Sequence, residues 1–221
     1  MSRLQPHVIT SPNFNPLQSA YRKHHSTETA LLNTLNHIYS AADNSQPTIL
    51  VSLDLSAAFD TIDHGILLSR LHSEFGISGA SLEWIRSYLT GRSQRVTVGH
   101  SHSSYQSVTT GVPQGSVLGP LLFTCYISPA GHLINSFGIF HQQYADDMQL
   151  FIELSINAAA TVINQLERCL SALHCWLCLN GLSLNPDKSE AIWRSTVQRA
   201  RSFTLQRLSA SLALSSRHQI P

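Results

Sequence analysis

Paired acids are the first candidate for chemistry in this sequence. Asp146 and Asp147 are adjacent and lie between two short runs that predict strands, Ile139–Ala145 and Met148–Glu153. Because neighbouring carboxylates repel each other, such a pair at the tip of a hairpin suits a divalent cation or a bound phosphate network. A solvated turn is the alternative, since Asp is a common turn residue. The dipeptide by itself leaves both interpretations open.

A third acid stands at the end of another predicted strand. Thr48–Leu53 is apolar and rich in β-branched residues, which predicts a buried strand that delivers Asp54 at its end. Asp54 and Asp146 are far apart in the sequence, so only tertiary structure can bring them together. If this strand pairs beside the hairpin, the carboxylates converge and can hold two Mg²⁺ ions roughly 3.5–4 Å apart, an arrangement that serves phosphoryl transfer. Asp60 and Asp63, just downstream, are expected to cap the next helix.

A glycine-rich loop is the second stretch of chemical interest. Gly111–Ser116 reads Gly-Val-Pro-Gln-Gly-Ser and stands immediately before the predicted apolar helix Val117–Phe123. Its backbone N–H groups and the amide of Gln114 could be presented to a ligand. It is not a Walker-type phosphate loop, because no Gly-Lys-Ser/Thr follows. An ordinary loop-to-helix turn remains the alternative.

The elements that must position these residues mix helices and strands. Helices are predicted from the N-cap Ser26 to Ala42, over His64–Phe75, over Gly79–Leu89, and along an apolar stripe from Ile156 to Leu177 that Asn180-Gly181 ends. Further strands are predicted over Arg92–Val98, Tyr105–Thr109 and Ser189–Trp193. Because regular βαβ alternation is absent, this order indicates an α+β fold.

The connecting segments add two basic features and two irregular ends. Arg22–His25 precedes a helix start and could cradle phosphate, with a solvated basic turn as the alternative. Leu182–Lys188 is expected to be a turn that brings Lys188 back toward the sheet. Met1–Leu17, with three prolines, is expected to be an irregular lead-in, and Thr196–Pro221 to be poorly ordered.

Composition points to surfaces that other molecules cover. Of 221 residues 43% are apolar and only 12% charged, which suggests faces covered by more polypeptide or by nucleic acid. The net charge of +1 neither advertises nor excludes a polyanionic partner. Met1–Pro6 has no apolar core typical of a signal peptide, and the apolar run Val117–Ile127 is far shorter than the roughly 20 residues of a membrane span. We therefore expect no membrane association.

Four cysteines are too sparse to indicate a disulfide framework. Cys175 and Cys178 form a lone CxxC, but no second pair or suitably spaced His ligands follow, so zinc is weakly supported. Together with Cys125 and Cys169 they are expected to pack as small apolar side chains, and their irregular spacing fits a reducing compartment.

Five segments of the chain resemble the motifs of reverse transcriptases. Their amino-acid sequences are most similar to those of LINE-type (non-long-terminal-repeat) retrotransposons. In order they are Gln18–Glu28, similar to a finger-region motif, and Leu53–Asp60, Gly111–Pro120, Tyr144–Asp147 and Leu184–Glu190, similar to the successive palm motifs. The resemblance covers about residues 4–195, with the motifs in the correct order and at natural spacing.

The resemblance implies a role for each candidate residue. Asp54 and Asp146 would be ligands of two Mg²⁺ ions, with Mn²⁺ as a possible substitute, and Asp147 would complete the acidic site. Lys188 would protonate the pyrophosphate leaving group. In the nucleotide pocket, Phe59 would exclude a ribose 2′-OH, Gln114 and Gly115 would line the pocket, and Arg22 would neutralise the triphosphate.

The resemblance also implies an architecture and a reaction. Residues 48–195 would form a polymerase palm, a ferredoxin-like antiparallel sheet with helices on one face, while residues 1–47 would be partial fingers, 196–221 a poorly ordered tail, and a thumb would be absent. The expected activity is RNA-directed DNA synthesis in retrotransposition from an RNA template, a DNA primer and dNTP. The expected location is the nucleus and cytoplasm, as a ribonucleoprotein. The alternative is an inactive, truncated retrotransposon remnant that at most binds nucleic acid.

Overall fold

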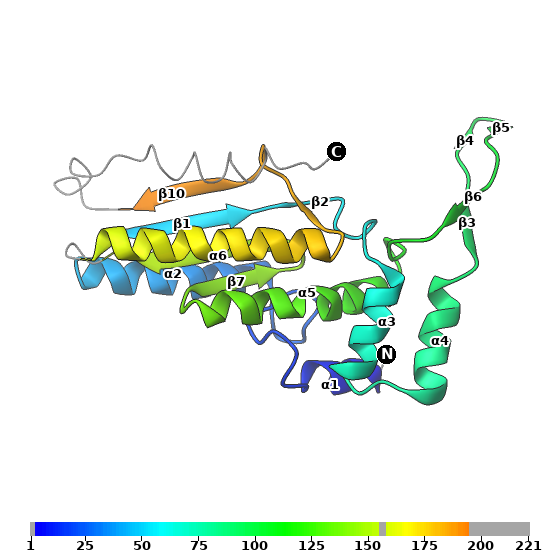
Figure 1. The fold of residues 1–221 in the computed structure, drawn as a ribbon, viewed down its shortest axis with the longest axis horizontal. Coiled ribbons are helices and arrows are strands. Elements are labelled where there is room, and N and C mark those ends of the chain that lie inside the picture. The colour runs from blue at the N-terminus through cyan, green and yellow to red at the C-terminus, as the bar shows by residue number, and fades with distance from the viewer. Residues whose placement is uncertain (1–2, 155–157, 195–221) are drawn as a thin grey trace. The chain divides into compact units, whose positions relative to one another are not determined.

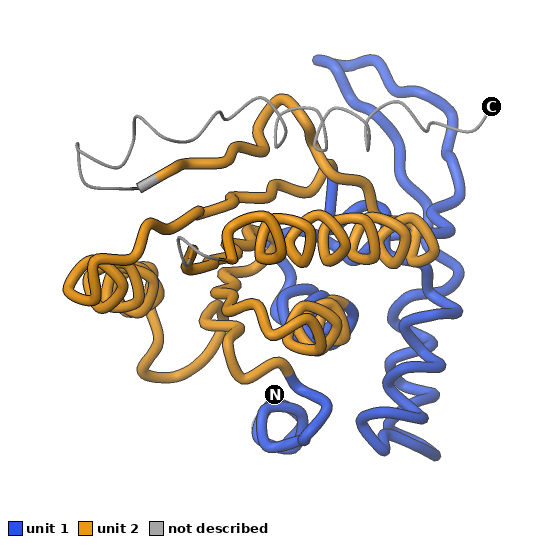
Figure 2. Tube along the Cα trace, turned by 60° about the vertical axis from the view of Figure 1, so that its left-hand side comes forward, with its two compact units in different colours: residues 1–14, 57–126 blue, residues 15–56, 127–221 orange. Residues whose placement is uncertain are grey.

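The computed structural model describes residues 3–154 and 158–194, and they form two units that each contain residues distant in the sequence. Unit 1 comprises residues 1–14 and 57–126, and unit 2 comprises residues 15–56 and 127–221 (Figure 2). The predicted mixture of helices and strands is confirmed. The predicted disorder of residues 196–221 lies outside the described residues.

Unit 2 is built on a four-stranded antiparallel sheet in the order β10-β1-β8-β7 (Figure 1). The strands are β1 (Thr48–Leu53), β7 (Phe140–Tyr144), β8 (Asp147–Glu153) and β10 (Glu190–Arg194). The predicted strands near these positions are therefore confirmed, as is the hairpin that β7 and β8 form. Strand β1 pairs along its full length with β8, which is the neighbour relation on which the convergence of the acids depends.

Each face of this sheet has its own helices. Ser26 is the N-cap of helix α2 (Thr27–Asp43), as predicted, and it forms a capping box with Thr29. Side chains of α2 donate hydrogen bonds to Gln142 and Gln149 on one face. The second half of α5 (Gly119–Ser136) approaches the opposite face, where a Cβ on Gly131 would lie 2.8 Å from Nε2 of His141. Apolar side chains of β1 and β8 are buried on that second face.

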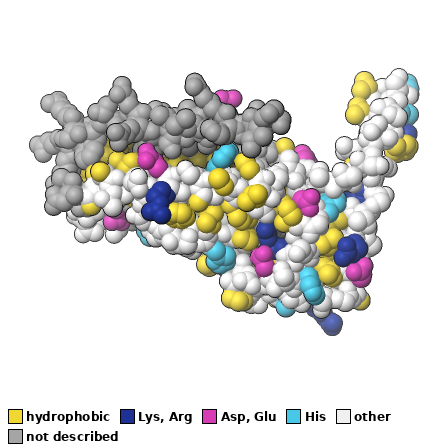
Figure 3. Space-filling view, in the orientation of Figure 1, with side chains coloured by type: hydrophobic (Ala, Val, Ile, Leu, Met, Phe, Trp, Pro, Cys, Tyr) yellow, Lys and Arg dark blue, Asp and Glu magenta, His cyan; other side chains and the backbone are white. Residues whose placement is uncertain are grey.

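The long helix α6 (Ala159–Leu179) ends at Asn180-Gly181, as predicted. Of its predicted apolar stripe, Leu166, Leu173 and Leu177 are among the buried residues, while Ile156 lies outside the described residues. Cys175 and Cys178 lie on the exposed side of the helix, so their predicted packing is wrong, whereas Cys125 and Cys169 are buried. Figure 3 shows many hydrophobic and few charged side chains over this part of the surface, in line with the low charged content.

Unit 1 contains α3 (His64–Ser73) and α4 (Gly79–Leu89), which pack against each other. The predicted strand pair after α4 is split in two: β3 (Arg92–Gln94) pairs with β6 (Gln106–Val108), and β4 (Thr97–Val98) pairs with β5 (Ser101–His102). Asp63 caps α3, since its carboxylate accepts a hydrogen bond from the Ile66 N–H at 2.8 Å. Asp60 does not cap the helix, because its carboxylate accepts hydrogen bonds from Gln114 instead.

One segment predicted to be irregular is helical, and one predicted helix is confirmed with different bounds. Residues Leu4–Ile9 form the short helix α1 rather than an irregular lead-in. Pro6 is tolerated there because the first turn of a helix leaves its N–H groups unbonded in any case. The predicted helix Val117–Phe123 begins at Gly119 and continues to Ser136, with Pro129 inside it. No helix among residues 3–154 and 158–194 is long and apolar enough to cross a membrane.

Candidate active site

The register of the sheet brings Asp54 close to Asp147. Leu53, the last residue of β1, pairs with Met148, so Asp54 directly follows the ladder and Asp147 is the residue of β8 next to Met148. Paired positions point to the same side of a sheet. Leu53 and Met148 point to the buried face, with exposed fractions of 2% and 1%. Asp147, the neighbour of Met148 on β8, consequently points to the other, more open face, and the charge of Asp54 acts on it there.

Asp146 lies in the turn between β7 and β8. Tyr144 pairs with Asp147, which leaves Ala145 and Asp146 as a two-residue turn. Ala145 has a φ of 55°, a left-handed conformation that favours glycine. Such a conformation in a buried alanine requires support from its surroundings.

The three carboxylates interact electrostatically. Burial raises the pKa of Asp147, and the negative charges of Asp146 and Asp54 raise it further, while the charge of Lys188 lowers it. The same acidic turn acts on Tyr21, whose pKa is raised by burial first and by Asp146 second. The site thus has an excess of negative charge that one lysine only partly offsets.

The segment between α6 and β10 carries Lys188 to this site. Strand β9 (Ser183–Leu184) pairs with β2 (Leu55–Ser56), and the Asn185 N–H donates to the Asp54 carbonyl at 2.8 Å. These contacts bring the Lys188 ammonium to 3.9 Å from Oδ2 of Asp54. The predicted return of Lys188 toward the sheet is therefore confirmed.

Asp54, Asp146 and Asp147 offer carboxylate oxygens as possible ligands of a divalent cation. Carboxylate oxygens are the ligands that Mg²⁺ prefers, and the mutual repulsion that raises the pKa of Asp147 is the repulsion that a bound cation relieves. In the described part of the chain no group of three His, Cys, Asp or Glu side chains is already gathered as a metal cage. Asp54, Asp146 and Asp147 therefore fit magnesium in donor type and charge, without forming a closed cage.

A small hollow of about 150 Å³ adjoins the acidic turn within unit 2. Strand residues Tyr144, Asp147 and Gln149 line one side, and Thr27 and Leu31 of α2 are among the residues on the other. The hollow places the start of α2 beside the acidic face of the sheet.

Phe59 and Gln114, in unit 1, lie on two loops that are tied together. The Val112 N–H donates to the Phe59 carbonyl at 2.8 Å, and a Cβ on Gly111 would lie 2.8 Å from the Asp60 carbonyl oxygen, so only glycine fits there. The half-buried Phe59 ring stacks on Phe123 with ring centroids 4.6 Å apart. Gln114 is exposed and donates from Nε2 to both carboxylate oxygens of Asp60 at 3.3 Å.

Gly115 and Arg22 are the remaining predicted residues. Gly115 has a φ of 74° and open space where a Cβ would stand. Arg22, in unit 2, donates from Nη1 to the carbonyls of Pro16 and Gln18 at 2.7 and 3.0 Å, and partial burial lowers its pKa. Its guanidinium thus braces the loop before α2, and its predicted role toward a triphosphate stays a prediction.

Residues 1–203 match the family model described as "Reverse transcriptase (RNA-dependent DNA polymerase)". The chain belongs to the reverse transcriptase family. Members of this family generally use divalent metal ions. The family membership that the five motifs indicated is therefore confirmed.

Proteins of non-long-terminal-repeat retrotransposons are similar to this reverse transcriptase sequence. The "Probable RNA-directed DNA polymerase from transposon BS" of Drosophila melanogaster is 31% identical over 177 residues, 78% of this chain and 19% of that protein. The "RNA-directed DNA polymerase from mobile element jockey" of Drosophila funebris is 28% identical over 176 residues, 77% of this chain and 19% of that protein. The chain spans about a fifth of the length of these relatives.

Solved structures show where else this reverse transcriptase fold occurs. Telomerase from Candida albicans, in complex with a fragment of telomeric RNA, superposes with a TM-score of 0.62 at 14% identity and covers 88% of this chain and 35% of that one. Apo telomerase from Candida tropicalis, truncated from its C-terminal domain, gives a TM-score of 0.60 at 14% identity, with 80% and 36% covered. At this identity the likeness shows the fold alone.

Sequence reasoning missed the polar residues that support the acidic turn of this reverse transcriptase. Gln18 is fully buried, and its side chain is hydrogen-bonded to both backbone groups of Ala145. Gln143 and Asn15, also buried, continue the same set of hydrogen bonds. The available signal was the pair Gln142-Gln143 inside an otherwise buried strand, since buried amides require partners.

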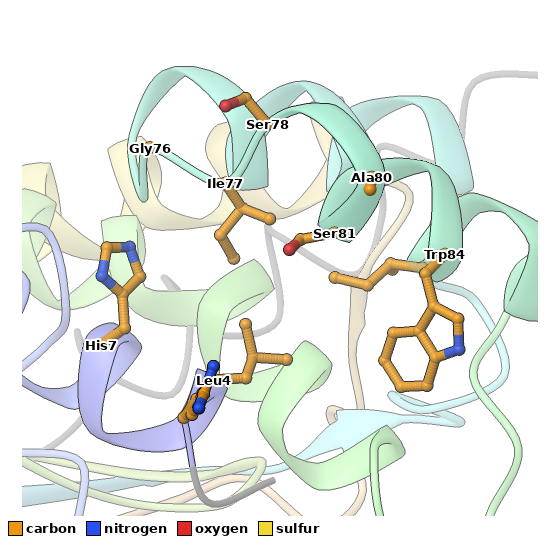
Figure 4. A pocket seen from close by; sticks show the side chains of 10 residues that line it. Leu4, His7, Gly76, Ile77, Ser78, Ala80, Ser81 and Trp84 are labelled. Carbon is orange, nitrogen blue, oxygen red and sulfur yellow. The ribbon is translucent and has the colours of Figure 1, made fainter.

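A hollow in unit 1 contains none of the predicted site residues. It measures about 720 Å³ and lies between α1 and the start of α4 (Figure 4). Leu4 and His7 of α1 face Ile77, Ser81 and Trp84 across it. The Trp84 side chain is 56% exposed, so the hollow is an open groove.

Proposed function

We propose that this chain is the catalytic domain of an RNA-directed DNA polymerase that joins deoxynucleotides to the 3′-OH of a primer on an RNA template. The observation that carries this proposal is the gathering of three interacting carboxylates at the ends of β1 and β8: Asp54 follows β1, Asp147 begins β8, and Asp146 lies in the turn, with Lys188 at 3.9 Å from Asp54. Family membership and the names of the relatives support it.

The acidic residues have the first proposed roles. Asp54 and Asp146 would hold the divalent ions, and Asp147, close to Asp54, would complete the acidic site. When bound, two Mg²⁺ ions would lower the pKa of the attacking hydroxyl and stabilise charge on the leaving oxygens. The three carboxylates also keep the site negative, so that an incoming polyphosphate is repelled unless cations accompany it.

Lys188 is proposed as the proton donor to the pyrophosphate that leaves. Its ammonium is held near Asp54 by the β2–β9 ladder and by the hydrogen bond from the Asn185 N–H to the Asp54 carbonyl. The Lys188 side chain is 69% exposed, so it can reach a bound ligand without breaking a buried contact. A general acid must lie within reach of the leaving oxygen, and the nearness of Lys188 to Asp54 supports this role.

Residues of unit 1 are proposed to select the nucleotide. The Phe59 ring, held by Phe123, would exclude a ribose 2′-OH by its bulk. Gln114 and Gly115 would line the nucleotide pocket on the loop tied to Phe59. In unit 2, Arg22 would offset part of the triphosphate charge.

The architecture and cellular setting are part of the same proposal. Residues 48–195, which contain the antiparallel sheet and helices α5 and α6, would be the palm, and residues 1–47, which contain α2, would be part of the fingers. The RNA template, DNA primer and dNTP would be the partners. The expected location is a ribonucleoprotein of the nucleus and cytoplasm.

Primer extension tests the proposal. The chain is incubated with an oligo(dT) primer on poly(rA), dTTP and Mg²⁺, and Asp146→Asn is the matched control because it keeps side-chain size while removing the charge. We expect incorporation by the wild type to exceed that of the variant by at least about 100-fold, the range seen when a group needed in the transition state is removed. Equal incorporation by the two chains would overturn the proposal.

A further inference from the structure

The acidic turn contains a buried backbone conformation that the ladder between β7 and β8 does not stabilise. Ala145 has a φ of 55° and an exposed fraction of 8%, and it directly precedes Asp146. As the first residue of a two-residue turn, it lies outside the paired positions of β7 and β8. Its N–H and C=O therefore need other partners, because buried backbone groups without hydrogen bonds are strongly disfavoured.

Gln18 supplies partners for both groups. Its Oε1 accepts a hydrogen bond from the Ala145 N–H at 2.9 Å, and its Nε2 donates to the Ala145 carbonyl at 2.9 Å. Two hydrogen bonds from one planar amide define the orientation of the Ala145 backbone in the way that a neighbouring strand would. The Ala145 conformation thus depends on a residue more than a hundred positions earlier in the chain.

The Gln18 amide is itself held in place. Its Oε1 also accepts a hydrogen bond from the Ala20 N–H at 3.0 Å, and the side chain is fully buried. The backbone around it is paired with β7, since the Ser19 N–H donates to the Gln143 carbonyl at 2.9 Å and the Gln143 N–H donates to the Leu17 carbonyl at 3.0 Å. The amide is therefore fixed relative to the strand that leads into the turn.

A second layer of amides supports the same carbonyl. Gln143 donates from Nε2 to the Ala145 carbonyl at 3.2 Å, and its Oε1 accepts a hydrogen bond from Nδ2 of Asn15 at 2.9 Å. All three side chains are buried, where an unsatisfied amide is costly. The network consequently favours one arrangement of the turn.

We propose that Gln18 is a positioning residue for catalysis: by hydrogen bonding to both backbone groups of Ala145, it fixes the direction in which Asp146 presents its carboxylate. This inference rests on the proposed polymerase activity. Gln18 contacts no reacting atom in this scheme and acts only through the turn. Misplacement of a reacting group by about 1 Å can cost about 100-fold in rate, which sets the size of the effect expected.

The test compares Gln18→Met with Gln142→Met in the primer-extension assay. Both glutamines are buried at 0% and 4%, but the Gln142 amide bonds to Leu17, Ser19, Asn33 and the Gln143 carbonyl and not to Ala145. We expect Gln18→Met to lower kcat on the order of 100-fold with the KM for dTTP within about threefold of wild type. Gln142→Met is expected to keep kcat within about threefold. Equal kcat values for the two variants would overturn the positioning role.

A conformational rescue separates positioning from general loss of stability. Glycine adopts a left-handed conformation without steric cost, so adding Ala145→Gly to Gln18→Met is expected to recover kcat by about tenfold. A variant that is merely poorly folded would not recover in this way. No recovery would contradict the proposal. Should Gln18→Met fail to fold, Gln18→Glu keeps the acceptor for the Ala145 N–H but loses the donor to its carbonyl, and wild-type kcat in that variant would equally overturn the role.

Hydrogen exchange of the Ala145 amide gives a readout that needs no turnover. We expect exchange at this amide to accelerate at least about tenfold in Gln18→Met and to stay at the wild-type rate in Gln142→Met, because Gln18, and not Gln142, accepts its hydrogen bond. Unchanged exchange in Gln18→Met would overturn the proposal. If the wild type incorporates no more than Asp146→Asn, the proposed function fails; if it is active and Gln18→Met is equally active, the positioning role alone fails.

Discussion

The ammonium of Lys188 lies 3.9 Å from Oδ2 of Asp54, although the two residues are separated by most of the folded chain. Backbone hydrogen bonds hold the two segments together, through the β2–β9 ladder and through the bond from the Asn185 N–H to the Asp54 carbonyl. The ion pair itself contributes little to stability, about 0–1 kcal/mol, since the lysine is mostly exposed. We therefore expect Lys188 to contribute to catalysis rather than to stability.

Replacement of Lys188 tests whether it transfers a proton. We expect Lys188→Gln to lower kcat about 100-fold, within the range for loss of a general acid. Lys188→Arg keeps a positive charge near Asp54 but cannot release a proton at ordinary pH. This variant is therefore expected to have the KM for dTTP of the wild type and the lowered kcat of Lys188→Gln. The measurement is kcat and KM as a function of pH. A wild-type kcat in Lys188→Arg would show that charge alone suffices.

Removal of one charge from the acidic site should alter its response to metal. Burial and the charges of Asp146 and Asp54 raise the pKa of Asp147, so its ionised form is disfavoured in the folded state and stability falls as pH rises through that pKa. In EDTA at pH 7 we expect Asp147→Asn to be more stable than wild type, by no more than about 1 kcal/mol because the site is partly exposed. Millimolar Mg²⁺ should raise Tm more in the wild type than in the variant. Equal Mg²⁺ shifts would argue against a carboxylate metal site.

A smaller side chain at Phe59 should weaken sugar selection. The ring is held by stacking on Phe123, so Phe59→Val removes a fixed steric wall. We expect the ratio of kcat/KM for dNTP over rNTP to fall at least about tenfold. Phe75→Leu is the control, because Phe75 is a buried aromatic residue of the same unit and should affect stability without altering selectivity. The proposed role of Phe59 is wrong if both variants keep the wild-type ratio.

His141 should make the fold sensitive to acid. Burial lowers the pKa of His141 to about 4, with a further contribution from His132, and its buried Nδ1 has no hydrogen-bond partner among the residues that the structure describes. A pKa below the unfolded value of 6.5 means that the unfolded chain binds the proton first, so stability is lost as pH falls from about 6.5 toward about 4.

The acid sensitivity can be isolated with one variant. Between pH 7 and pH 5 the wild type is expected to lose about 2 kcal/mol more than His141→Gln, at 1.36 kcal/mol for each pH unit below 6.5. Urea unfolding at the two pH values measures the difference. Parallel losses in the two proteins would assign the acid sensitivity to other groups.

Strands and helices with strong local signals were predictable. Thr48–Leu53 has the composition of a buried strand and forms β1 with those bounds, and Ser26 is an N-cap that the structure confirms with a capping box. The sequence predicted that Asp54 approaches the hairpin only if the strand Thr48–Leu53 pairs beside it, because no local pattern specifies which strands pair. The register of β1 against β8 supplies that missing information.

Other features depend on contacts that a local pattern does not encode. The short helix α1 contains Pro6, and helix α5 continues past Phe123 through Pro129, so prolines that indicate irregular structure were overridden by their positions in the fold. Asp60 resembles a helix cap in sequence but bonds to Gln114, a residue far along the chain. The support of Ala145 by Gln18 belongs to the same class, because it joins the first part of unit 2 to its last hairpin.

The pairing of Leu17–Ser19 with β7 has a consequence for solubility. An unpaired outer strand offers its N–H and C=O groups to any extended peptide, and proteins usually block such edges. The backbone bonds of Leu17 and Ser19 to Gln143 occupy this position, so the strand that leads into the acidic turn is shielded from joining a second chain. A shortened protein that started at α2 would retain all three acids yet expose this edge, and we expect it to aggregate.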